Sequence, residues 1–267
     1  MGRMTGKTAV IAGSSWDGIG GLTALRLAEE GAQLVLNAEA MTARLEETRG
    51  RVRQLTDVVV VPGDVRQDTT WKDITDTAVE RFGGLTTLVY TPARCVSGDA
   101  LRLTPQEIRE TFDLTFDAAW LAARRCIPLM PTDGAAVVFV SSVNGTITNP
   151  GYAAYAAAKA ALDTLTRTLA VECAPQGVRV NAVAPGQIEG EASRRALLED
   201  PEEERACRAC YPLGRYGQPV EVANAILFLA SDEASFITGT VLRIDGGLSL
   251  VSVESLLRPS FARQRPR

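Results

Sequence analysis

The chain alternates, almost from end to end, between short apolar runs and longer segments whose apolar residues recur at helical spacing. The apolar runs cover residues 7–13, 32–38, 57–65, 86–93, 135–142, 178–186 and 239–247. The helical segments between them cover residues 18–31, 41–55, 70–82, 105–130, 152–173 and 219–231. Strands that are apolar on both faces indicate a parallel sheet covered by helices on both sides.

This order of elements predicts the fold class. Right-handed crossovers between seven such strands produce a single doubly wound α/β domain of the Rossmann type, with helices on both faces of a seven-stranded parallel sheet. We expect this domain over residues 1–249 and a C-terminal tail over residues 250–267. Residues 187–214 are charged and interrupt the alternation.

Composition removes several classes of function. The net charge of −4 argues against a nucleic-acid partner, since such proteins are usually basic. No apolar run is long enough to span a bilayer, and the first residues do not resemble a signal peptide, so we expect no membrane association and a cytoplasmic location. The five cysteines are odd in number, which favours reduced thiols. The chain has no histidine, which excludes a Ser-His-Asp triad and, with one Cys-x-x-Cys pair at 207–210, argues against a metal site.

A glycine-rich loop, AGSSWDGIGG at residues 12–21, lies where the first strand meets the first helix. Glycines let backbone N–H groups approach a phosphate closely, and the helix N-terminus adds partial positive charge. Many strand–helix turns contain glycine for conformational reasons alone. The position after the first strand of an α/β chain favours a dinucleotide pyrophosphate as the ligand.

Tyr155 and Lys159 lie one helical turn apart in the alanine-rich segment YAAYAAAKAAL, residues 152–162. A tyrosine packed on a lysine stem is the plain alternative. An ammonium beside a phenol favours the phenolate, so we expect Lys159 to lower the pKa of Tyr155 from about 10. Tyr152 has no lysine four residues on, which indicates packing or a pocket wall.

Together these features resemble the classical short-chain dehydrogenases/reductases, from about Lys7 to Gly247. The matching motifs are the loop end Gly18–Ile19–Gly20, the pair Asp64–Val65 after the third strand, Ser142 at the end of the fifth strand, the Tyr155–Lys159 pair, and Pro185–Gly186 after the sixth strand. The separation of 13 between serine and tyrosine is common in that family. Each motif alone is weak evidence, and their combination is specific.

The resemblance implies roles for four catalytic residues. Tyr155 would be the acid or base for a carbonyl/alcohol pair, and Ser142 would donate a hydrogen bond to the substrate oxygen. Lys159 would also hold the nicotinamide ribose. Thr115 occupies the position of the family's helical asparagine, which is part of a proton relay through water.

The resemblance also implies an NAD(P) cofactor. The expected cofactor-binding residues are Gly13, Ser14, Ser15, Gly18, Ile19, Gly20, Ala38, Asp64, Val65, Ala93, Tyr155, Lys159, Pro185, Gly186 and Ile188. Because the acids Asp17 and Glu39 would repel a 2′-phosphate, we expect NAD(H) to be favoured over NADP(H). Arg44 is the residue that would work against this preference if it reached the same site.

The chain departs from the family pattern at three places. Four residues separate Gly13 from Gly18, where the family usually has three. The fourth strand ends with residues 90–93, Tyr-Thr-Pro-Ala, in place of Asn-Asn-Ala-Gly, so that one backbone N–H is lost to proline and one methyl group is added. Thr115 replaces the helical asparagine and cannot copy both the donor and the acceptor of an amide.

The function implied is that of an oxidoreductase that moves a hydride between nicotinamide and the carbonyl or secondary alcohol of a small, apolar or cyclic substrate, a ketoreductase or alcohol dehydrogenase. Residues 187–214 lie where the family has its substrate lid, with Ile188, Leu197, Leu198 and Tyr211 as candidates for an apolar pocket. We expect a homotetramer or homodimer. Two alternatives remain open, namely a nucleotide-binding sensor or scaffold that has lost turnover, and an epimerase or dehydratase on the same scaffold.

Overall fold

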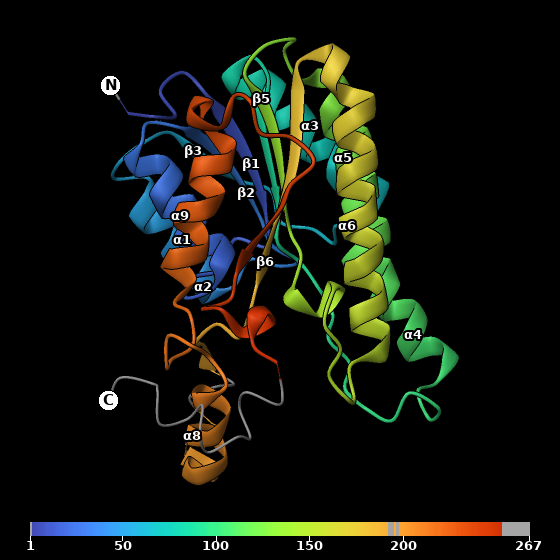
Figure 1. The fold of residues 1–267 in the computed structure, drawn as a ribbon. Helices are drawn as coiled ribbons and strands as arrows, with labels where there is room; N and C mark the ends of the chain where they lie inside the picture. Colours follow the sequence, from blue (N-terminus) through green and yellow to red (C-terminus); the bar gives the residue numbers. More distant parts are fainter. Residues whose placement is uncertain (1, 192–194, 196–197, 253–267) are drawn as a thin grey trace.

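The parallel sheet expected from the apolar runs is present in the computed structural model, which describes residues 2–191, 195 and 198–252 (Figure 1). The strands are β1 Thr8–Ala12, β2 Gln33–Asn37, β3 Val58–Val60, β4 Thr87–Tyr90, β5 Ala135–Val140, β6 Val178–Pro185 and β7 Val241–Ile244. They form one seven-stranded sheet in the order β3-β2-β1-β4-β5-β6-β7, with each neighbouring pair parallel. The predicted doubly wound Rossmann-type fold is confirmed.

Helices cover both faces of this sheet (Figure 1). They are α1 Ile19–Glu29, α2 Ala43–Val52, α3 Asp68–Phe82, α4 Pro105–Phe112, α5 Ala118–Cys126, α6 Ala153–Cys173, α8 Pro201–Ala209 and α9 Pro219–Ala230. Helices α1, α2 and α9 pack on one face, and α3, α5 and α6 pack on the other. Each face therefore has an apolar core of its own.

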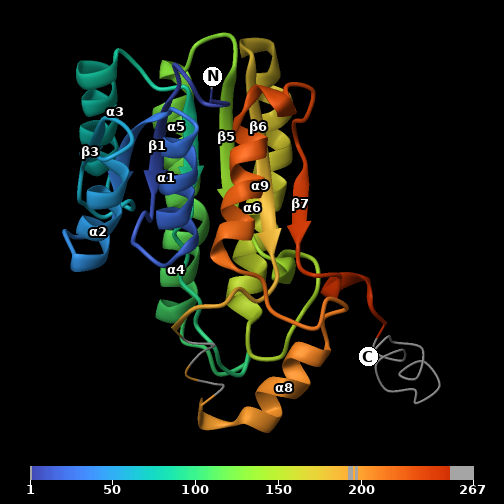
Figure 2. The ribbon, with the colours of Figure 1, turned by 90° about the vertical axis from the view of Figure 1, so that its left-hand side faces the viewer.

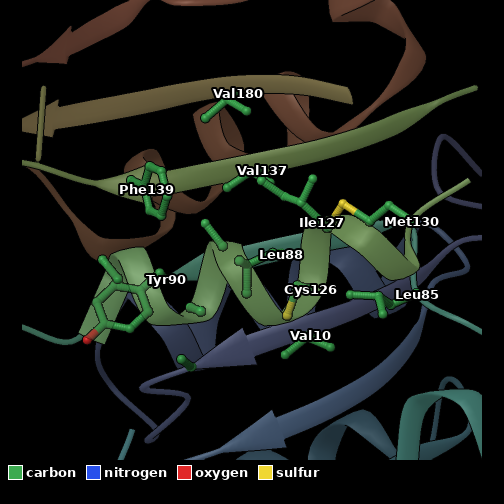
Figure 3. Close-up of a cluster of buried hydrophobic side chains, with 14 of the residues drawn as sticks. Val10, Leu85, Leu88, Tyr90, Cys126, Ile127, Met130, Val137, Phe139 and Val180 are labelled. Atoms are coloured by element: carbon green, nitrogen blue, oxygen red, sulfur yellow. The ribbon is translucent and has the colours of Figure 1, made fainter. Parts of the chain in front are cut away.

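Successive strand residues contribute alternately to the two cores. Val10 of β1 belongs to the core under α3, α5 and α6, whereas the next residue, Ile11, belongs to the core under α1, α2 and α9. Figure 3 shows the first of these cores, to which β4 contributes Leu88, β5 contributes Phe139 and the end of α5 contributes Cys126. Because both sides of the central strands β1, β4 and β5 are buried, these strands have no solvent-facing side, which is why apolar residues dominate them.

The long helix expected over residues 105–130 is interrupted, and the difference has a local cause. Between α4 and α5 the chain makes a π-helical turn, Asp113–Asp117, and a 3-10 turn ends the segment at Leu129. The Tyr90 hydroxyl at the end of β4 donates a hydrogen bond of 2.6 Å to the carbonyl of Leu114 within the π turn. The turn therefore has a hydrogen-bond partner outside the helix, and it carries Thr115.

The irregular segment expected over residues 187–214 contains helix α8, which lies beyond the carboxyl ends of β6 and β7 (Figure 2). Residues 192–194 and 196–197 of the expected lid, including Leu197, and residues 253–267 of the expected tail lie outside the described residues. All five cysteines are free thiols. Among the described helices, none combines the length and the apolar character that crossing a bilayer demands.

Candidate active site

The strand order places a crevice between β1 and β4, because the chain winds outward in opposite directions from these two neighbours. The glycine loop lies at the carboxyl end of β1 and leads into α1. Gly18 is the residue before this helix, and no side chain caps the helix N-terminus. Gly18 has no side chain with which to cap the first N–H groups of α1, and a helix N-terminus at this place suits an anion.

Two glycines of this loop are required by close contacts. Gly13 has a φ of +78°, and a Cβ on it would lie 2.3 Å from the Thr91 hydroxyl. A Cβ on Gly20 would lie 2.1 Å from the carbonyl oxygen of Gly13. The loop and the first turn of α1 are thus packed backbone against backbone, and only glycine fits at either position.

The additional loop residue is accommodated at Asp17, which has a φ of +64°. This left-handed conformation is uncommon for a residue other than glycine. The preceding residue, Trp16, anchors the loop to α2. Its backbone N–H donates to the Arg44 carbonyl at 3.0 Å, and the Arg51 guanidinium lies 4.1 Å from the centroid of its indole ring. The longer loop is therefore a fixed feature of the structure.

Asn37, at the end of β2, organises the floor of the crevice. Its carbonyl accepts the N–H groups of Gly13 and Ser14 and also the Ser14 hydroxyl, each at 2.9 Å. Its side-chain amide donates to the carbonyls of Val61 and Gly63. The Asn37 Oδ1 atom is buried and has no hydrogen-bond partner, so it is an acceptor available to a ligand.

A groove runs along this edge and collects residues from four strand ends. It is lined by Gly13, Ser15, Asn37, Ala38, Glu39, Gly63, Asp64, Val65, Arg66, Pro92, Arg94 and Leu114. Of the predicted cofactor-binding residues, Gly13, Ser15, Ala38, Asp64 and Val65 line it directly. Ser14 is fully buried beneath the groove, and Ala93 is exposed beside it.

Sequence reasoning missed two cations of this groove, Arg66 and Arg94. Arg66 bonds the Asp64 carboxylate at 2.8 Å and approaches Glu39 at 3.8 Å. The Arg66 guanidinium holds the pKa of Asp64 below its usual range. Arg44, the cation that sequence reasoning did consider, pairs instead with Glu191 at 2.9 Å. The signal for Arg66 was its place two residues after Asp64, where a turn brings both side chains back to the groove.

The predicted serine, tyrosine and lysine meet at the end of β5. Ser142 follows this strand, and its hydroxyl lies near enough to the Tyr155 phenol to act against the rise in the pKa of that group. Lys159 is 1% exposed, and its Nζ atom donates to the Val140 carbonyl at 2.6 Å. The same Nζ atom lies 5.6 Å from the centroid of the Tyr155 ring. The structure therefore brings together three of the four predicted catalytic side chains.

The electrostatic expectation for Tyr155 was wrong in its direction. Burial raises the pKa of Tyr155, the nearby Cys95 thiol raises it further, and only the Ser142 hydrogen bond opposes the rise. The Lys159 ammonium points to Val140, and the phenol loses more hydration than it gains in charge stabilisation. Burial also lowers the pKa of Lys159 to about 8.

Thr115, the fourth predicted catalytic residue, is fully buried on the π turn. Its hydroxyl accepts a hydrogen bond of 3.1 Å from the backbone N–H of Arg94. The threonine thus holds the segment that follows Pro92, the residue whose N–H group is missing. This contact links two of the three departures from the family pattern.

The turn after β6 borders the same edge of the sheet. Pro185 is the last residue of β6, and Gly186 is so close to Tyr211 and Asp245 that a Cβ would lie 3.2 Å from each. The Tyr211 hydroxyl accepts the N–H of Gln187 at 2.9 Å. Ile188 packs against the core on the α9 face. Leu198, in contrast, is 83% exposed, so it does not line an apolar pocket in this structure as was expected.

Comparisons with known proteins agree with this geometry. A family model described as enoyl-(acyl carrier protein) reductase matches residues 14–249. The chain is 34% identical over 256 residues to glucose 1-dehydrogenase of Gluconobacter oxydans, covering 93% of this chain and 94% of that protein. It is 36% identical over 252 residues to the 3-oxoacyl-(acyl-carrier-protein) reductase FabG of Thermotoga maritima, covering 92% and 99%. The structure of carveol dehydrogenase from Mycobacterium avium in complex with NAD is 28% identical, with a TM-score of 0.85 and coverage of 94% and 100%.

The uncapped helix end, the glycine loop and the serine–tyrosine–lysine group define a nicotinamide-dependent oxidoreductase site on a doubly wound sheet. The chain belongs to the short-chain dehydrogenase/reductase family and is an NAD(P)-dependent enzyme of that family. The residues present fit the cofactor, because Gly13 and Gly20 leave the backbone bare beside the helix N-terminus and Asn37 Oδ1 offers a buried acceptor.

The close packing at Gly20 gives a test of this fit. Gly20→Ala places a methyl group against the Gly13 carbonyl, so the loop must move, and we expect the affinity for NADH to fall by at least about tenfold, or about 1.4 kcal/mol. Gly50→Ala is the matched control, because this half-buried glycine of α2 has open space beside it and a Cβ there would meet nothing within 4 Å. Fluorescence titration of both variants with NADH decides, and equal affinities would contradict the assignment of the loop.

Proposed function

We propose that this enzyme is a ketoreductase or alcohol dehydrogenase, which moves a hydride between nicotinamide and the carbonyl or secondary alcohol carbon of a small substrate. The observation that carries the proposal is the meeting of Ser142, Tyr155 and Lys159 at the carboxyl end of β5. The dinucleotide groove lies at the same edge of the sheet. A proton donor, a hydrogen-bond donor and a buried cation are the groups that a carbonyl reduction needs beside its hydride source.

Tyr155, Ser142 and Lys159 have separate roles in this reaction. When bound, the cofactor accepts or supplies the hydride. During reduction, Tyr155 gives its proton to the substrate oxygen as negative charge develops there, and Ser142 donates a hydrogen bond to the same oxygen. The raised pKa of Tyr155 keeps the proton on the phenol until that moment. The Lys159 ammonium, held by the Val140 carbonyl, then stabilises the phenolate that remains.

Glycines and loop residues around the α1 N-terminus would hold the pyrophosphate, namely Gly13, Ser15, Gly18, Ile19 and Gly20. Asp64 and Val65 would border the adenine, and Lys159 would hold the nicotinamide ribose. The turn Pro185–Gly186 and the neighbouring Ile188 would complete the site on the side of β6. Thr115 would act on catalysis through the position of the Arg94 segment.

The substrate class is a small apolar or cyclic ketone or alcohol. Relatives are named for glucose, for a 3-oxoacyl group on a carrier protein and for carveol, so family membership alone does not select a substrate. Ile188 and Tyr211 support an apolar pocket wall beside the turn after β6. The enzyme suits the cytoplasm, because its free thiols and nicotinamide chemistry belong in a reducing compartment.

Replacement of the Tyr155 hydroxyl tests the reaction. Tyr155→Phe keeps the ring and removes only the proton, so we expect ketone reduction to slow by about two to four orders of magnitude, with NADH binding retained. Tyr152→Phe is the matched control on the same helix and should cost little. The assay follows loss of NADH absorbance with a panel of ketones. If wild type binds NADH and consumes none with any ketone, the sensor or epimerase alternatives replace this proposal.

We propose that NAD(H) is preferred over NADP(H), since Glu39 lies exposed at the groove and Arg66 is engaged by Asp64 and Glu39. Glu39→Gln removes one negative charge and one partner of Arg66, so we expect it to raise NADPH affinity by about fivefold, or about 1 kcal/mol. Glu46→Gln on α2 is the control, because Glu46 already pairs with Arg49 away from the groove. A wild-type protein that binds NADPH more tightly than NADH would show that the preference is inverted.

We propose a homotetramer or homodimer. Support comes from apolar side chains on the outer surface of α5 and α6, where Trp120 is 45% exposed and Val171 is 76% exposed. Light scattering at micromolar concentration should give two or four times the chain mass of 28.5 kDa. A mass of one chain would refute the proposal.

A further inference from the structure

The end of β5 contacts helix α6 at Tyr155, at Lys159 and at a third residue, Asp163, which has no role in the proposed chemistry. Lys159 donates to the Val140 carbonyl, and the hydroxyl of Ser141, the first residue after the strand, donates to the carboxylate of Asp163. The backbone N–H of Ser141 is taken by the Val183 carbonyl of β6 at 2.7 Å, so the serine is fixed on both sides. Asp163 therefore has a defined partner at the strand end.

Asp163 continues the line of the catalytic residues along the helix. Tyr155, Lys159 and Asp163 are spaced by four residues, and side chains at this spacing lie on one face, one turn above another. Residues 140–142, at and just after the end of β5, meet all three of them. Lys159 thus lies between Tyr155 and Asp163 along one face of the helix.

Both charged members of this line are buried. Asp163 is 3% exposed and Lys159 is 1% exposed. A buried ammonium is costly unless an opposite charge or hydrogen-bond acceptors compensate for its lost hydration. Besides the Val140 carbonyl, the groups that act on Lys159 are the Asp163 carboxylate and the Cys95 thiol, and both raise its pKa against the effect of burial.

The charge on Asp163 is supported in turn by its own neighbours. Burial raises the pKa of Asp163, while the Ser141 hydrogen bond, the exposed Arg167 one turn further on and Lys159 all oppose that rise. Gly145, in the loop after β5, leaves room for the carboxylate, since a Cβ there would lie 2.7 Å from Asp163 Oδ2. The Asp163 carboxylate thus occupies a defined position, with the Ser141 hydroxyl as its donor and the cations of Arg167 and Lys159 acting on it.

We propose that Asp163 is a positioning residue of the active site, whose carboxylate keeps Lys159 protonated and aligned between the Val140 carbonyl and Tyr155. The proposal rests on the proposed function in one respect, namely that the Lys159 cation supports proton transfer by Tyr155. The competing interpretation is a purely structural aspartate that fastens α6 to β5. That interpretation predicts a change in stability and no change in the ionisation of Lys159.

The chain offers a direct readout of this ionisation, because it contains three lysines, Lys7, Lys72 and Lys159. Protein labelled with ¹³C at lysine Cε gives one resonance for each, and the pH dependence of its shift reports the pKa of each amine without cofactor or substrate. Asp163→Asn keeps the shape and an acceptor for Ser141 and removes the charge. We expect the pKa of Lys159 to fall by at least about one pH unit and that of Lys72 to stay unchanged.

Two further variants serve as controls. Glu172→Gln removes an exposed acid from the same helix and should leave Lys159 unchanged. Ser141→Ala removes the donor that holds Asp163 and should lower the pKa of Lys159 by less than Asp163→Asn does. If Asp163→Asn fails to fold, the Ser141→Ala shift decides. An unchanged Lys159 resonance curve in the folded variant overturns the proposal.

Kinetics then connects the ionisation to catalysis. In Asp163→Asn, the high-pH limb of kcat/KM for ketone reduction should move to lower pH by the same amount as the pKa of Lys159. A shifted lysine with an unshifted limb would refute the positioning role. Absence of ketone reduction in wild type would instead refute the proposed function, and it would leave the lysine titration as an independent result.

Discussion

The parallel pairing of seven strands is the constraint on which the rest of this structure depends. Because a crossover carries the chain back to the amino end of the sheet before each new strand, all strands end at the opposite edge, and residues far apart in sequence meet there. The glycine loop after β1, Asn37 at the end of β2 and Ser142 after β5 share that edge for this reason. The two apolar cores, one on each face, hold the strand ends in position.

Two of the three departures from the family pattern are connected in three dimensions. Tyr90 takes the place of an asparagine, and its hydroxyl reaches the Leu114 carbonyl on the π turn. The same turn presents Thr115 to the N–H of Arg94, just beyond the proline that cannot donate. Each substitution alone removes a polar contact, and together they supply new ones. The hydrogen bonds of the site therefore differ from the family pattern, and the segments around it are still held together by hydrogen bonds.

Electrostatics at the edge depends on burial as much as on charge. Lys159 and Tyr155 were expected to act on one another as neighbours, yet loss of hydration is the larger influence on both. In the groove, Arg66 is neutralised by Asp64 and Glu39, so a cation that favours an additional phosphate is partly occupied. Pairing between side chains from different strand ends determines which charged groups remain available to a ligand. The distances within such pairs do not follow from sequence spacing.

The sequence by itself determined the order of the elements, the fold class and the local pairs. Short apolar runs alternating with helical segments predicted the strands, and Tyr155 and Lys159 are neighbours on any helix, because one turn fixes their separation. Only the tertiary structure decided contacts between separate elements. It placed a π turn within the expected helix over 105–130 and a hydroxyl from β4 on that turn, brought Arg66 to Glu39, and set the Ser141 hydroxyl on Asp163. These contacts depend on how strand ends and helix faces are placed relative to each other, and that placement is fixed by packing across the whole sheet.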